Sequence, residues 1–144
     1  GAAEAHIAQA AGTRAVKAAE GPVAKVASGR VTTLFPNLIP KDAIEAMKAF
    51  PLEAIARARY SGRVNYVVLE SGALVVGRSG HTSLSQGAPV LAAGEARFIN
   101  GLLRSLDNRS GHYRPSGADA RSAAEAAFGR AGIDAVGKYI EKVF

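Results

Sequence analysis

The chain has 144 residues, 48% of them hydrophobic, with no cysteine and a formal net charge of +6. This length predicts about one domain, and the apolar share is enough for a core without cross-links. The absence of cysteine excludes a disulfide framework, a thiolate metal site and a thiol nucleophile. The three histidines, His6, His81 and His112, lack the HExxH spacing of zinc sites, so we expect neither a metal nor another cofactor.

The basic balance predicts an anionic partner such as a nucleic acid, a nucleotide or an acidic protein. Every basic residue between Lys48 and Lys138 is an arginine, whose planar fork binds phosphate or carboxylate in a bidentate manner. The alternative is that the arginine content reflects a GC-rich genome. No apolar run reaches ~20 residues and the start lacks a secretory pattern, so we expect no membrane span. Because Gly1 begins within a helical pattern, we expect a piece of a longer protein.

The first half of the chain predicts helices. Alanine dominates from Ala2 to Glu20, and Gly21-Pro22 would end that helix and open a short second one. Residues 31–40 form a connector, and two more helices are predicted over 41–50 and 51–60, where Pro51 suits a first helical position.

The second half changes to a strand pattern. Four antiparallel strands are predicted over 65–69, 73–77, 90–99 and 102–107, with a polar loop over 78–86. Asn100-Gly101 is typical of a two-residue type I′ turn between the last two.

A helix follows over 117–130, with Ser116 and Asp119 resembling a capping box, and residues 138–144 predict a last strand. The fold class is therefore α+β: N-terminal helices followed by a mostly antiparallel four- to five-stranded sheet with one helix before the last strand. We expect a helical region over 1–62 to pack on a sheet core over 63–144 within one compact domain.

The segment Ser110-Gly111-His112-Tyr113-Arg114-Pro115-Ser116 concentrates groups that transfer protons or bind anions. His81 and His112 both follow a glycine at a predicted loop, and both imidazoles can titrate near neutral pH. The alternative is that these are ordinary loop residues whose rings are half buried.

A two-residue turn at Asn100-Gly101 would place Arg97 opposite Arg104, with Glu95 on the same sheet face. Opposed arginines repel unless an anion lies between them, so Glu95 or a bound phosphate is expected there. A solvated sheet face whose charges satisfy one another is the alternative.

These groups suit metal-independent cleavage of a phosphodiester. Glu95 or His81 would take the proton of a ribose 2′-hydroxyl, which attacks phosphorus, and His112 would protonate the leaving 5′-oxygen. Tyr113 could stack on a base or donate to the phosphate. The residues predicted to bind substrate are Arg97, Arg104, Arg114, Arg78 and Ser83.

A resemblance supports this hypothesis. The chain from about residue 64 to 144 resembles the C-terminal toxin modules of bacterial polymorphic toxins, which are the tips of contact-dependent growth-inhibition, filamentous-haemagglutinin-like and Rhs-type proteins. The motifs that carry it are Tyr66-Val67-Val68, Gly80-His81-Thr82-Ser83-Leu84, Ala93-Gly94-Glu95, 108–116 and 137–143.

The resemblance implies a domain delivered from the cell surface into the cytoplasm of a competing bacterium and neutralised by a cognate immunity protein. Many such modules are ribonucleases of the barnase, EndoU, colicin and RelE type, for which RNA, and tRNA in particular, is the substrate. Its functional residues map to His81, Glu95, His112 and Tyr113. We expect an acidic immunity protein to cover the arginine-bearing sheet face.

Two other functions use the same residues. An ADP-ribosyltransferase or NAD-cleaving toxin would employ a histidine, a tyrosine and a glutamate around nicotinamide. A non-enzymatic module would bind nucleic acid through its basic surface, although aromatic residues are only 6% of the chain.

Overall fold

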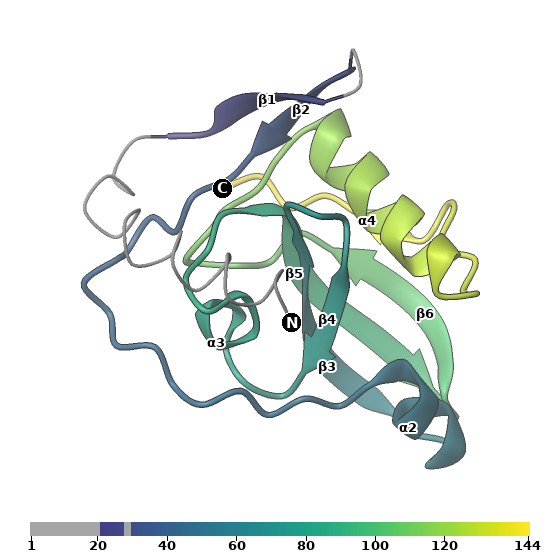
Figure 1. Cartoon of the computed structure of the whole chain (residues 1–144). Helices are drawn as coiled ribbons and strands as arrows, with labels where there is room; N and C mark the ends of the chain where they lie inside the picture. Colours follow the sequence, from purple (N-terminus) through teal and green to yellow (C-terminus); the bar gives the residue numbers. More distant parts are fainter. Residues whose placement is uncertain (1–20, 28–29) are drawn as a thin grey trace.

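The computed structural model describes residues 21–27 and 30–144 and has an α+β fold (Figure 1), as predicted. Its main sheet has five strands in the order β4-β3-β5-β6-β7. β3 to β6 are antiparallel, and β7 pairs with β6 in parallel. The strands are β3 (Gly62–Leu69), β4 (Leu74–Gly77), β5 (Val90–Ile99), β6 (Leu102–Asp107) and β7 (Tyr139–Ile140).

The four predicted antiparallel strands are confirmed as β3 to β6. The turn between β5 and β6 has positive φ at both central residues, 51° at Asn100 and 80° at Gly101, as a type I′ turn requires. Near this turn, buried and exposed residues alternate along β5, so one side of the strand faces the core and the other faces solvent.

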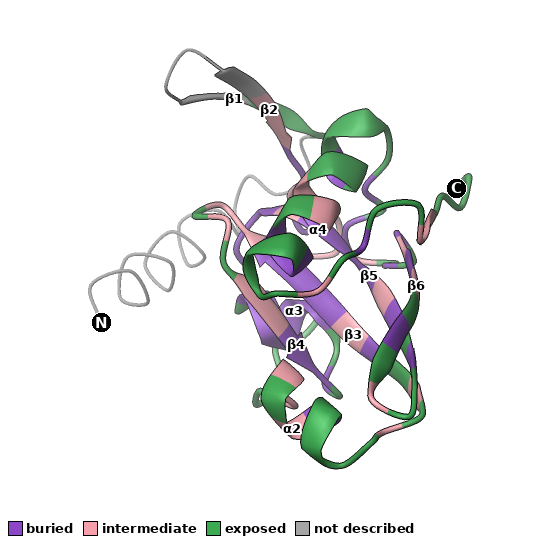
Figure 2. Ribbon diagram, turned by 90° about the vertical axis from the view of Figure 1, so that its right-hand side faces the viewer, coloured by how far each residue is buried: buried purple, intermediate pink, exposed green. Residues whose placement is uncertain are grey.

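The two faces of the sheet are covered differently (Figure 2). Helix α4 (Ala118–Arg130) packs on one face, where Phe128 meets Tyr66 edge to face with ring centroids 5.4 Å apart. Helix α3 (His81–Ser85) contributes Leu84 to a second apolar cluster with Val67. The second face therefore has an apolar end under α3, and its other end carries charged side chains.

The predicted second short helix at Gly21-Pro22 is wrong, because β1 (Val23–Ala27) and β2 (Arg30–Leu34) pair there as an antiparallel hairpin. Valines and threonines are frequent in this segment, and their branched side chains favour strands. The predicted connector over 31–40 thus begins as a strand. The helix predicted over Ala2–Glu20 lies outside the described residues.

The helix predicted over 41–50 is also wrong. Residues 41–49 are exposed and irregular, and the end of the segment joins the edge of the sheet, where Phe50 N donates to Val76 O at 3.0 Å. Pro51 disfavours the helical conformation of the residue before it, and β4 offers unpaired backbone groups. The helix predicted over 51–60 is confirmed in a shorter form as α2 (Leu52–Arg57). The region 21–62 is therefore not the helical region that was predicted.

The end of the chain differs in two details. α4 is preceded by Gly117 rather than capped by Ser116, and the Asp119 carboxylate accepts a hydrogen bond from the Thr33 hydroxyl at 2.8 Å. The predicted last strand over 138–144 shortens to β7, because the backbone of Lys142 pairs with the Asn108 side chain instead of a strand. A helix before the last strand is confirmed.

Candidate functional site

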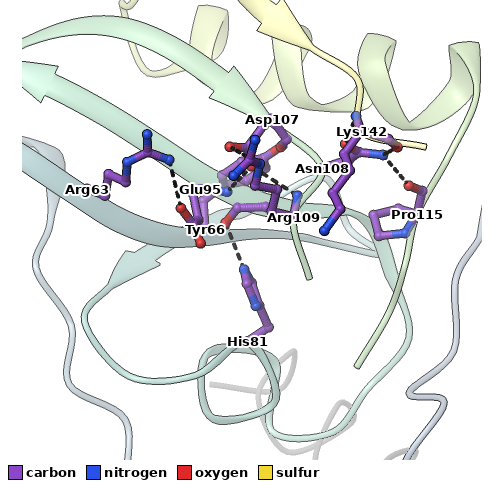
Figure 3. A network of polar contacts seen from close by, with 10 residues as sticks. Arg63, Tyr66, His81, Glu95, Asp107, Asn108, Arg109, Pro115 and Lys142 are labelled. Carbon is purple, nitrogen blue, oxygen red and sulfur yellow. Dashed lines mark hydrogen bonds and ion pairs between the residues drawn. The ribbon is translucent and has the colours of Figure 1, made fainter. Parts of the chain in front are cut away.

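The charged end of the second sheet face is formed by neighbouring residues of β3 and β5, and we call it the polar face: Arg63, Asn65, Glu95 and Arg97. Arg63 is the register partner of Arg97, and Asn65 is the partner of Glu95. The Arg63 guanidinium lies 3.2 Å from the Glu95 carboxylate (Figure 3). The two side chains are 55% and 32% exposed, so this ion pair is open to solvent.

The predicted pairing of Arg97 with Arg104 is wrong. Arg97 pairs with Ser105, because a bulge next to Phe98 adds a residue to β6 and leaves Arg104 outside the register. Two arginines do face each other as expected, but they are Arg63 and Arg97 on β3 and β5. Their repulsion is relieved by Glu95, and an added anion would relieve it further.

His81, the first residue of α3, points at the strand that carries Glu95 (Figure 3). Its Nε2 lies 2.7 Å from the Gly94 carbonyl oxygen. A carbonyl can only accept, so Nε2 carries the proton and Nδ1 keeps its lone pair in the neutral ring. Burial lowers the pKa of His81, and this effect outweighs the Gly94 hydrogen bond and the carboxylates of Glu95 and Asp107, which favour the charged ring.

The charge of His112 also lowers the pKa of His81. Glu95 directly follows Gly94, whose carbonyl accepts the hydrogen bond of His81. Asp107 bonds to the backbone of Glu95 and of Arg109, at the base of the loop that carries His112.

Asp107, at the end of β6, ties this strand to the middle of β5. Its Oδ1 accepts hydrogen bonds from the backbone N of Glu95 at 2.8 Å and of Arg109 at 2.9 Å. The Asp107 carbonyl packs so closely on Gly94 that a Cβ there would overlap it. These contacts fix the backbone on which Glu95 and the acceptor of His81 lie.

Asn108, which is fully buried, holds the loop that carries His112 (Figure 3). Its amide donates to Pro115 O at 2.8 Å and to Lys142 O at 2.9 Å, and its oxygen accepts from Lys142 N at 2.6 Å. The loop 109–116 is thereby closed at its base and joined to the C-terminal segment.

His112 itself is held from the other side by the segment after β2. Its carbonyl accepts from Leu38 N at 2.6 Å, and its Nε2 lies 3.0 Å from the Asp42 carboxylate. The side chain of His112 is 30% exposed. A carboxylate that accepts from Nε2 orients the ring and leaves Nδ1 for another partner.

Tyr113 and Ser83 are buried, with 1% and 2% of their surfaces exposed. The Tyr113 hydroxyl donates to Ala88 O at 2.6 Å and lies 2.6 Å from the Ser85 hydroxyl. Burial raises the pKa of this phenol. Tyr113 thus anchors the His112 loop against the end of α3 and is not placed to touch a substrate.

The remaining predicted arginines are not among the four residues that define the polar face. Arg78 lies with its guanidinium 4.3 Å from the centre of the Phe50 ring. Arg104 and Arg114 are exposed, and Arg114 has an unusual positive φ of 44° within the loop. Arg97, two residues after Glu95 on β5, is the predicted phosphate-binding residue that belongs to the polar face.

Sequence reasoning missed Arg63, Asp42, Asp107 and Asn108. Arg63 could have been found by pairing the first predicted strand with the third and extending it by two residues. Asp107 and Asn108 lie just before the segment 110–116 that carries His112. Aspartate and asparagine are common in turns, so this pair was a visible signal. Asp42 is 70 residues from His112 in the chain, and no pattern connects them.

Comparison with protein-family models, with curated proteins and with solved structures finds no match to this chain. No helix in the described ranges is long and apolar enough to span a membrane. Within residues 21–27 and 30–144, no three His, Asp or Glu side chains group closely enough to hold a metal ion.

Proposed function

We propose that the chain is an interbacterial toxin domain that cleaves RNA without a metal, by attack of a ribose 2′-hydroxyl on the adjacent phosphorus. The observation that carries this proposal is that Asp107 bonds to the backbone of both Glu95 and Arg109, which joins Glu95 to the base of the loop that carries His112, beside the opposed arginines of the polar face. This set combines a base, an acid and cations for a phosphate, which is what the reaction requires.

Glu95 is the base in this mechanism. Its carboxylate is more accessible than His81, whose Nε2 is occupied by the Gly94 carbonyl and whose ring is buried. Glu95 accepts the proton of the 2′-hydroxyl while that oxygen forms its bond to phosphorus. His81 acts by positioning, because it connects α3 to the backbone next to Glu95.

His112 is the acid. Asp42 holds one ring nitrogen, and the other donates a proton to the 5′-oxygen as the bond between phosphorus and that oxygen breaks. The products are a 2′,3′-cyclic phosphate and a 5′-hydroxyl. Arg63 and Arg97 stabilise the charge on the phosphoryl oxygens in the transition state.

The toxin context rests on the resemblance of residues 64–144 to polymorphic toxin modules, and it implies an acidic immunity protein. The exposed arginines of the polar face are the natural contact for acidic side chains. Such a complex should weaken steeply as salt is added, because exposed charges are screened.

The experiment is incubation of the purified chain with total bacterial RNA and with tRNA, with and without EDTA. We expect discrete fragments that end in a cyclic phosphate under both conditions, and no cleavage of an RNA with 2′-deoxyribose at the cut position. His112→Ala and Glu95→Gln should each lower the cleavage rate about 100- to 10,000-fold. Glu53→Gln, which changes an exposed carboxylate on α2, is the matched control.

Full activity of a folded His112→Ala protein would refute this mechanism. Loss of NAD from treated cells with intact RNA would instead identify an NAD-cleaving toxin. Salt-sensitive RNA binding with no cleavage under any condition would identify a binding module.

A further inference from the structure

A second group of planar side chains lies just beyond the end of β4. Phe50 and Tyr60 pack beside the core cluster that contains Tyr66 and Phe98. Their rings meet edge to face with centroids 5.1 Å apart. The Arg78 guanidinium lies 4.3 Å from the Phe50 centroid and 5.5 Å from the Tyr60 centroid. We call this group the arginine-aromatic stack.

The backbone holds the stack in place. Arg78 N donates to Lys48 O at 2.9 Å, and Phe50 N donates to Val76 O at 3.0 Å. These two hydrogen bonds attach residues 48–50 to the end of β4, and they hold the backbone of Phe50 and of Arg78 in fixed positions. Arg78 is exposed although its guanidinium lies against a ring, so a planar cation is held at the surface in one orientation.

The chain around the stack is basic. The segment that runs from Lys48 to Arg63, both included, carries four basic residues and one acidic residue, Glu53. The Tyr60 hydroxyl donates to the carbonyl of Arg63 at 3.2 Å, and the Arg63 side chain reaches Glu95 on the polar face. Arg63 therefore connects the stack to the proposed catalytic centre.

We propose that the arginine-aromatic stack binds an unpaired base of a single-stranded RNA, in a nucleotide that flanks the scissile bond; this inference rests on the proposed function. Unpaired bases stack on aromatic rings and on arginine guanidinium planes, whereas the bases of a duplex are hidden from such surfaces. The neighbouring cations neutralise the phosphates of the same strand. The substrate class is therefore single-stranded RNA or a loop of a folded RNA.

The test measures binding of a fluorescent 2′-O-methyl oligonucleotide, which the proposed chemistry cannot cleave. Arg78→Lys keeps the charge and removes the plane, so we expect affinity for the single strand to fall about tenfold with the salt dependence unchanged. Arg121→Lys, which makes the same exchange at an exposed residue of α4, should leave the affinity unchanged. Phe50→Leu, checked for folding by circular dichroism, should weaken binding as Arg78→Lys does.

Wild-type affinity of Arg78→Lys for the single strand would overturn the inference, even if His112→Ala abolishes cleavage. Equal loss of affinity for a duplex and for the single strand would also overturn it. A tenfold loss in Arg78→Lys together with full cleavage by His112→Ala would support the stack while refuting the proposed mechanism. Failure of the wild-type chain to bind any RNA would refute both.

Discussion

At the scale of single residues, Gly94 illustrates how close packing brings Glu95 and His81 together. The Asp107 carbonyl lies where the Cβ of any other residue at this position would be. We expect Gly94→Ala to lower the free energy of unfolding by more than about 4 kcal/mol, because backbone rather than a flexible side chain must shift. Urea unfolding measures this change.

The matched control is Gly80→Ala, one residue before His81. Gly80 has φ −63°, which suits any residue, and a Cβ there meets nothing within 4 Å. Its unfolding free energy should stay within about 0.5 kcal/mol of the wild type. If both variants lose a similar amount of unfolding free energy, the close contact between the Asp107 carbonyl and position 94 is not the reason that a glycine is needed there.

Residue types were easier to predict than their partners. His81, Glu95 and His112 were found because their chemistry is visible in the sequence, and His81 does bond to the carbonyl of Gly94, the residue before Glu95. The Arg97 partner was predicted wrongly because a bulge shifts a register without changing the alternation that the sequence shows. Tyr113 looks like a catalytic group until its burial is known.

At the scale of elements, the loop 109–116 depends on Asn108, whose side chain makes three hydrogen bonds to backbone groups. Asn108→Ala leaves these buried groups without partners, so we expect a loss of about 3 kcal/mol in the free energy of unfolding. Amide hydrogen exchange should accelerate in the loop and in residues 141–144. Because His112 is on this loop, the cleavage rate should fall as well.

Arg109→Ala, at the next position, is the control for that variant. Its guanidinium lies 3.7 Å from the Asp107 carboxylate in an exposed ion pair. Such pairs contribute at most about 1 kcal/mol. If hydrogen exchange in residues 141–144 is the same in the two variants, Asn108 does not join the loop to the C-terminal segment.

The elements that sequence predicted well are those that pair with their neighbours in the chain. β5 and β6 are joined by Asn100-Gly101, and local turn chemistry is enough to specify them. The segment 41–50 has a helical composition. Its end is nevertheless hydrogen-bonded to β4, which lies more than twenty residues later in the chain. Non-local backbone pairing overrides helix propensity there, and no local pattern reports it.

At the scale of the whole molecule, the α+β architecture makes stability depend on the protonation of His81. Burial holds its pKa below the ordinary value of 6.5 in the folded chain, so the unfolded chain takes up this proton first as the pH falls. The contribution of the neutral ring is fully present above about pH 6.5 and is lost as the pH falls toward the lowered pKa.

We therefore expect the free energy of unfolding of the wild-type chain to decrease between pH 7.5 and pH 5, and to decrease less in His81→Gln. The glutamine amide can still donate to the Gly94 carbonyl but cannot take up a proton in this range. Urea unfolding at a series of pH values measures both slopes. Identical slopes would mean that His81 does not link folding to pH, and that the contact between α3 and β5 is not protonation-dependent.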